Sequence, residues 1–198
     1  MFLRPIWLGT SEQLMAFNLL EDPVFRVART DGASASLSLP ALLQELARDT
    51  ISSFESQRAH QAQPFHALLV QLAAIVIDRF GGSAVRDEAD WREVLRGLTP
   101  EWPDDEPWSL VVSDLTAPAF MQPGFPRLEW ADFSKASTTP DEIDCLLTAK
   151  NHAVKSAMVS AAHPDHWVYA LGCLQTTSGY MGRGNYGVAR LPDSYAGL

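Results

Sequence analysis

The residues best suited to ligand binding lie near the C-terminal end of the chain. Residues 179–187 hold four glycines, two tyrosines and one arginine, and no carboxylate. Glycine lets the backbone approach a ligand closely, and exposed N–H groups in such a loop favour anions. Arg183 adds a planar fork that matches phosphate, and Tyr180 and Tyr186 offer flat faces for a base or sugar. The segment therefore predicts a phosphate or nucleic-acid contact.

This glycine-rich segment also has a purely structural interpretation, as a glycine-rich turn. No Lys-Ser/Thr pair follows it, which excludes a Walker A loop. It does not follow a predicted strand either, which argues against a dinucleotide-binding fingerprint. Its candidate contact residues are Gly179, Tyr180, Gly182, Arg183, Gly184, Asn185 and Tyr186.

A second basic segment, residues 148–155, contains Lys150, Asn151 and Lys155. On a continuous helix the two lysines are five residues apart and only loosely share one side. If the helix breaks at Asn151, the segment becomes a polar loop able to grip a phosphodiester. Both a solvated helix face and a nucleic-acid contact remain open for it.

The sequence shows no catalytic or metal-binding constellation. His163 and His166 lack a second ligand pair at zinc-site spacing and are expected in a polar turn at a helix start. Cys145 and Cys173 stand among leucines and are expected to be core thiols. The acidic residues 104–106 are expected to form a solvated, solubilising loop. We accordingly predict a non-enzyme with no catalytic residue, no metal and no cofactor.

Charge is distributed unevenly along the 198 residues, whose net charge is −9. Residues 1–144 carry 11 Lys/Arg against 22 Asp/Glu, whereas residues 145–198 carry four Lys/Arg against two Asp. An acidic body with a mildly basic end fits a protein that touches a polyanion at one place. It does not fit a protein that coats DNA by charge alone, because non-specific affinity scales with the phosphates neutralised.

The elements that must position these segments suggest an α+β fold, mostly helical with a small antiparallel β component. Val24–Ser38 alternates about an Asp31-Gly32 turn and predicts an N-terminal hairpin. Apolar spacing and caps predict helices at 39–49, 64–80, 88–96 and 164–176, another starting near Asp141, and a strand at 109–115. The 64–80 helix is apolar around much of its circumference and is expected to be central and buried.

Composition places the chain among ordinary globular proteins, with 46% hydrophobic residues. No apolar run has the length of a membrane span, and the N-terminus lacks a secretory pattern, so no membrane partner is expected. Two cysteines are too few for a disulfide framework. These observations predict a cytoplasmic protein.

Several segments in order resemble the CasA family, the large subunit of the type I-E CRISPR surveillance complex Cascade. The chain opens with Phe17-Asn18-Leu19-Leu20-x-Asp22-Pro23 and a hairpin, followed by the 64–80 helix and by Pro118-Ala119-Phe120-Met121-Gln122. Leu146-Leu147-x-x-Lys150-Asn151-His152 and Leu171-x-x-Leu174-Gln175-Thr176, leading into the glycines, complete the set. The resemblance covers nearly the whole chain and rests on the set in register rather than on one motif.

The resemblance implies a role in DNA sensing. CasA-like subunits lie beside the 5′ handle of the guide RNA, inspect double-stranded DNA for the protospacer-adjacent motif, and help to open the duplex. They also contact other Cascade subunits and help recruit a helicase–nuclease effector. The glycine-rich loop of the family approaches the target duplex, and the loop after the Leu-Leu segment contacts the motif and handle region. These roles carry over to residues 179–187 and to Lys150, Asn151 and Lys155.

Two departures from the family pattern limit the resemblance. CasA proteins are usually far longer, so residues 1–198 are expected to form a single CasA-like N-terminal domain, as a fragment or as a short variant. Tyr180-Met181 stands where many relatives have more glycines, so the motif preference does not transfer. The alternatives to DNA sensing are a small nucleotide- or phosphate-binding protein that uses residues 179–187, and a scaffold subunit without DNA contact.

Overall fold

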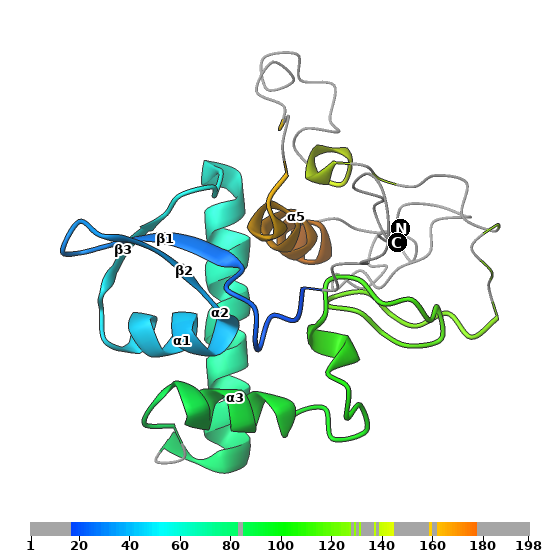
Figure 1. The fold of residues 1–198 in the computed structure, drawn as a ribbon, viewed down its shortest axis with the longest axis horizontal. Coiled ribbons are helices and arrows are strands. Elements are labelled where there is room, and N and C mark those ends of the chain that lie inside the picture. The colour runs from blue at the N-terminus through cyan, green and yellow to red at the C-terminus, as the bar shows by residue number, and fades with distance from the viewer. Residues whose placement is uncertain are drawn as a thin grey trace, which may run out of the picture.

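The computed structural model describes residues 17–82, 85–127, 129, 131, 137, 139–144, 159 and 162–177. These form an α+β fold, as predicted, in which a three-stranded antiparallel sheet packs with four α-helices. The long helix α2 (Ala59–Phe80) stands upright in Figure 1, with the sheet and α1 on one side and α5 on the other. α3 lies across the C-terminal part of α2.

The predicted hairpin is confirmed. β1 (Phe25–Arg29) pairs with β2 (Ser34–Leu37), and Gly32 takes a φ of 88° in the connecting turn, a conformation that favours glycine. A third strand, β3 (Ile51–Phe54), pairs with the other edge of β1 to give the order β2-β1-β3. β3 was not predicted, because its Ile-Ser-Ser-Phe sequence is too short to show a clear alternation.

The predicted helices at 39–49 and 88–96 are confirmed as α1 (Leu39–Ala47) and α3 (Glu88–Arg96). Ser38 and Asp87 cap their first turns by accepting backbone N–H groups. α5 (Pro164–Thr177) also forms where a helix was predicted.

α2 begins earlier than its prediction, at Ala59 rather than at Pro64. The Gln61 side chain accepts the Arg58 N–H at 3.1 Å and stabilises this extra N-terminal turn. The 64–80 helix was expected to be central and buried, but only one of its faces is buried. Phe65 faces the core at 1% exposure, whereas Val70 and Ile77 are 52% and 51% exposed. Packing covers one face of the helix, which its apolar composition alone did not reveal.

The core is aromatic where the sheet, α2 and α5 meet. The Phe65 ring lies 5.7 Å from that of Phe25 and 5.4 Å from that of Phe54. Tyr169 of α5 packs edge-on against Phe65 at 4.9 Å. α5 is therefore fixed against the other two layers by ring contacts.

The proline-rich region 99–126 folds without the predicted strand at 109–115. It contains a short 3-10 helix, η2 (Glu106–Trp108), and two isolated bridges, one between Asn18 and Ser109 and one between Ala119 and Gln122. At Gly124 a Cβ atom would lie 2.2 Å from the Thr116 carbonyl oxygen, so two stretches of backbone approach more closely than a side chain allows. The helix predicted to start near Asp141 is described only as a 3-10 turn, η4 (Pro140–Glu142). Among the helices of the described ranges, none combines the length and apolar character that crossing a bilayer requires.

Candidate nucleic-acid interface

All ten residues predicted to contact nucleic acid lie outside the described residues: Lys150, Asn151, Lys155, Gly179, Tyr180, Gly182, Arg183, Gly184, Asn185 and Tyr186. The structure does describe the residues from which their two segments depart. Residues 145–158 lie between Asp144 and Val159, and the glycine-rich segment follows Thr177 at the end of α5.

Helix α5 lies between these two segments in the sequence. η4 packs against α5, and Val159 precedes the first residue of α5 by five positions. A helix of 14 residues is about 21 Å long. The glycine-rich segment follows the C-terminal end of this helix, whereas residues 145–158 precede the helix in the sequence.

Asp141 connects Arg58, before α2, with Val159, before α5. Its side chain is fully buried and accepts two hydrogen bonds on different oxygens. Arg58, which precedes α2, donates from Nη1 to Oδ1 at 2.7 Å. The backbone N–H of Val159 donates to Oδ2 at 2.6 Å. One carboxylate thus joins the residues on either side of the 145–158 segment.

Asp144, also fully buried, binds the first turn of α2. His60 Nε2 lies 2.9 Å from both carboxylate oxygens, and Gln61 Nε2 donates to Oδ2 at 2.6 Å. A carboxylate at this position also faces the positive end of the helix dipole. Asp144, the residue directly before residues 145–158, is therefore bound by side chains of the first turn of α2.

A third buried carboxylate, Asp165, binds the sheet to the first turn of α5. Arg26 of β1 donates to it from Nε and Nη2, both at 3.0 Å, and Ser56 Oγ donates at 3.0 Å. This two-pronged geometry suits an arginine–carboxylate pair. Burial, together with the nearby Asp165 charge, raises the pKa of the neighbouring Tyr169 hydroxyl far above its usual range.

The His163-x-x-His166 pair forms the polar turn that the sequence predicted. The His163 N–H donates to His166 Nδ1 at 2.9 Å at the start of α5. Burial lowers the pKa of His166, although Asp165 opposes this effect. Across the ranges the structure describes, no group of three or more His, Cys, Asp or Glu side chains is placed to hold a metal ion. Cys173 is buried in the core as expected, and Cys145 lies outside the described residues.

The C-terminal end of α5 is fixed by a different contact. Gln175, 9% exposed, donates from Nε2 to the Met121 carbonyl oxygen at 2.8 Å. Met121 has a φ of 56°, and Gln122 beside it is buried and donates to the Leu110 carbonyl oxygen at 3.0 Å. The last described turn before the glycine-rich segment thus packs on a constrained turn of the 99–126 region.

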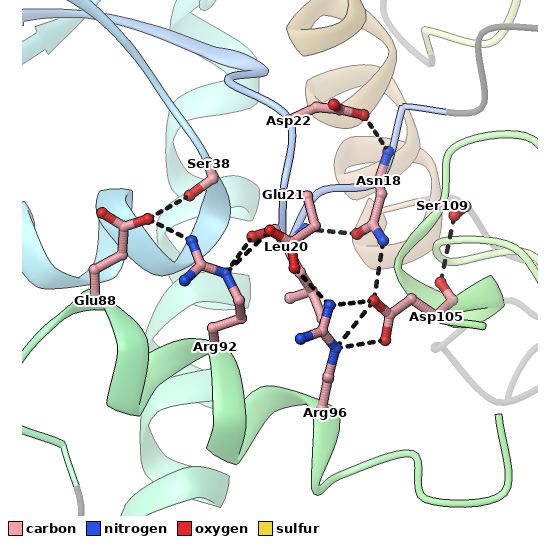
Figure 2. Close-up of polar contacts among 10 residues, drawn as sticks. All are labelled: Asn18, Leu20, Glu21, Asp22, Ser38, Glu88, Arg92, Arg96, Asp105 and Ser109. Atoms are coloured by element: carbon pink, nitrogen blue, oxygen red, sulfur yellow. Dashed lines mark hydrogen bonds and ion pairs between the residues drawn. The ribbon is translucent and has the colours of Figure 1, made fainter. Parts of the chain in front are cut away.

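Figure 2 shows a polar network around Asn18, in the segment of residues 17–23. The network connects this segment to α3 and to η2. Asn18 Oδ1 accepts the Leu20 N–H, and its Nδ2 donates to Asp105 at 3.0 Å. Arg96 of α3 donates to Asp105 at 2.7 Å and to Glu21 at 2.5 Å. These contacts give the segment of residues 17–23 a structural role in the fold.

The expectation that residues 104–106 form a solvated charge run holds for the exposed Asp104 but is wrong for Asp105. Asp105 is only 6% exposed, and hydrogen bonds from Arg96 and then Asn18 hold its pKa below the usual value. The pKa of Arg96 is raised in return, first by Asp105 and then by Glu21. The sequence did not reveal this, because the partners are separated by nine and 87 positions.

Sequence reasoning also missed the buried polar contacts around the first turns of α2 and α5, which involve Arg26, Arg58, His60, Gln61, Asp141, Asp144 and Asp165. The side-chain partners in these contacts are more than 80 positions apart in the sequence. The chain matches no family model, no curated protein and no solved structure.

Proposed function

We propose that this chain is a non-catalytic, CasA-like subunit of a CRISPR RNA-guided surveillance complex in the cytoplasm. It senses the protospacer-adjacent motif in double-stranded DNA and contacts the 5′ handle region of the guide RNA. By these contacts it helps to unwind the target and to recruit a helicase–nuclease effector. Other subunits of the complex supply most of the positive charge, because the body of this chain is acidic.

The observation that carries the proposal is the contact between two motifs of the resemblance. Pro118-Ala119-Phe120-Met121-Gln122 and Leu171-x-x-Leu174-Gln175-Thr176 are about 50 positions apart in the sequence. Gln175 donates to the Met121 carbonyl oxygen across this separation. Family-like residues therefore meet directly before the glycine-rich segment, where the proposal requires a rigid support for a DNA-contacting loop.

Charge and residue type suggest the role of each candidate. Arg183 and Lys150 bind phosphates, and Asn151 and Asn185 donate or accept hydrogen bonds at base edges or sugars. The glycines allow close approach of the backbone, which suits a narrow minor groove and its sparse pattern of donors and acceptors. These are few positive contacts, which again suits a subunit that inspects DNA held by a larger complex.

The test is co-purification with a guide RNA and candidate partner subunits, followed by binding to duplexes that differ only in the short motif beside the target. We expect binding to depend on both the motif and this chain. Binding that is indifferent to the chain would reject the proposal. A melting temperature of the isolated chain that rises with mononucleotide concentration would instead favour a nucleotide-binding protein.

A further inference from the structure

We propose that two copies of this chain associate through the outer face of α2, which forms an antiparallel pair with the same helix of the second copy. The contact surface is a seam of residues spaced three and four positions apart, which we call the α2 seam: Gln63, His66, Val70, Ala73, Ile77 and Phe80. The proposal goes beyond the proposed function and does not depend on it, because it concerns the chain by itself.

Exposed apolar side chains are concentrated on α2. Among the residues that the structure describes, the large apolar side chains that are exposed are Val70, Ile75, Ile77 and Phe80. All four belong to this one helix. Single apolar side chains scattered over a surface are ordinary, whereas a group of them on one element marks an interaction surface.

The spacing along α2 brings three of these side chains to one side of the helix. Val70 and Ile77 are seven positions apart, so their directions differ by only about 20° around the axis. Ala73 lies between them and completes the spacing of three and four that is typical of a coiled-coil seam. Phe65 points to the core of the domain instead, so α2 has a second apolar face that its own core does not cover. This spacing indicates another helix as the partner.

The seam lies on a part of the helix that carries no full charge. Residues 59–77 contain no Lys, Arg, Asp or Glu, although these residues make up 20% of the chain. The outer face of a solvated helix is usually charged or polar. Two copies with a net charge of −9 repel each other, so they approach closely only through a surface without carboxylates. An uncharged seam therefore suits a second copy, and it does not suit nucleic acid, whose phosphates require cations.

The order of large and small side chains favours the antiparallel arrangement. With a two-fold axis between positions 71 and 72, the opposing pairs across the axis are Val70 with Ala73, Ile77 with His66, and Phe80 with Gln63. Each pair combines a large apolar side chain with a smaller or partly polar one, as close packing requires. A parallel pair sets Ala73 against Ala73 and His66 against His66, which leaves a gap and brings two imidazoles together. The antiparallel pair also opposes the two helix dipoles.

The size of the seam sets the strength of the pair. Its 18 residues span about 27 Å of a helix that is about 10–12 Å wide. If a second helix covers about half of the circumference over this length, the two copies together bury roughly 900 Å². This area is at the low end for specific interfaces, so we expect a reversible dimer with a dissociation constant between about 1 and 100 µM.

Sedimentation equilibrium of the full chain, from about 1 to 500 µM, measures this association. We expect Val70→Lys to raise the dissociation constant at least about tenfold, because it places two like charges beside the axis. Ile75→Lys is the matched control. It adds the same charge to the same helix at an exposed position about 140° around the axis from Val70, and we expect it to stay within about twofold of the wild type. A wild type that stays monomeric throughout, or equal effects of the two lysine variants, would overturn the proposal.

A mixture of Val70→Lys and Val70→Glu tests whether the seam meets itself. Each variant alone should be monomeric at concentrations where the wild type is a dimer, and the mixture should associate because opposite charges now meet across the axis. Urea midpoints of both variants close to that of the wild type establish that the monomers are folded. A mixture that associates no better than its components would show that Val70 does not lie at a contact between two copies, and the proposal would fail.

Discussion

The side-chain amide of Gln175 donates a hydrogen bond to the main-chain carbonyl of Met121 and so joins the last turn of α5 to the 119–122 turn. Met121 itself has a φ of 56°, a left-handed conformation that is unfavourable for a methionine. Gln175 donates to its carbonyl oxygen, and the next residue, the buried Gln122, donates from its side chain to the Leu110 carbonyl oxygen. The end of α5 is thus supported by a turn whose conformation depends on the same contacts.

Replacing Gln175 with leucine tests this support. The variant leaves the partly buried Met121 carbonyl oxygen without its donor, and we expect the free energy of unfolding to fall by about 1–3 kcal/mol. Urea denaturation measures the change. Gln63→Leu on the exposed side of α2 is the matched control and should change stability by less than about 0.5 kcal/mol. Equal effects of the two variants would show that the contact contributes nothing.

Local signals in the sequence were sufficient for most of the fold. The Asp31-Gly32 turn, the Ser38 cap and the Asp87 cap each act within a few residues, and the elements that they define are confirmed. The predicted strand at 109–115 failed because its apolar residues are buried in irregular chain between prolines. Burial produces the same composition in a strand and in a packed loop, so alternation was a poor guide there.

The candidate site was less accessible to sequence reasoning. Glycine, arginine and lysine patterns indicated segments 148–155 and 179–187, but their supports come from distant residues. Arg58 donates to Asp141, which lies 83 positions further along the sequence, and Arg26 donates to Asp165, which lies 139 positions further along. The local sequence around either arginine does not show whether its side chain binds a buried carboxylate or faces solvent. The pairing exists only once α2, α5 and the sheet have packed.

Asp105 should make stability depend on pH in the acid range. Its folded-state pKa lies below the ordinary 3.8, because Arg96 and then Asn18 donate hydrogen bonds to the charged form. The stabilisation is therefore complete above about pH 4 and is lost as the pH falls through the lower folded-state pKa. We expect Asp105→Asn to lower stability at pH 7 and to flatten the dependence below pH 4. Urea midpoints from pH 7 to pH 2.5 test this, and parallel profiles would contradict it.

His166 should make stability depend on pH near neutrality, around its ordinary pKa of 6.5. Burial lowers its folded-state pKa below the ordinary 6.5, against the attraction of Asp165 and with smaller repulsion from Arg26, His163 and Arg58. The unfolded chain then binds the proton more readily, so this residue lowers stability as the pH falls below 6.5. Protonation also removes the Nδ1 acceptor of the His163 N–H.

The measurement is the change in unfolding free energy between pH 7.5 and pH 5.5, in the wild type and in His166→Asn. We expect the loss at pH 5.5 to be smaller in the variant, because one disfavoured protonation has been removed. The other histidines remain in both proteins, so the difference isolates this residue. An unchanged loss would contradict the assignment.

The two sides of α2 should respond very differently to truncation. Phe65 is 1% exposed and contacts the rings of Phe25, Phe54 and Tyr169, so Phe65→Ala should cost about 3–5 kcal/mol. Val70, five positions later, is 52% exposed, and Val70→Ala should change stability by less than about 0.5 kcal/mol in the isolated chain. Thermal or urea unfolding of the two variants measures the contrast, and a comparable loss for Val70→Ala would contradict the observed packing.

Gly182→Asp addresses the proposed function directly. If the glycine-rich segment approaches phosphates as proposed, an added side chain and negative charge should weaken target binding by about tenfold or more, since like charge repels and close approach is lost. Gly82→Asp is the matched control. It adds the same charge at the end of α2, where a Cβ atom meets nothing within 4 Å. Both variants should unfold at the wild-type urea concentration. If a folded Gly182→Asp protein binds a motif-containing duplex as tightly as Gly82→Asp does, the glycine-rich segment does not contact the target.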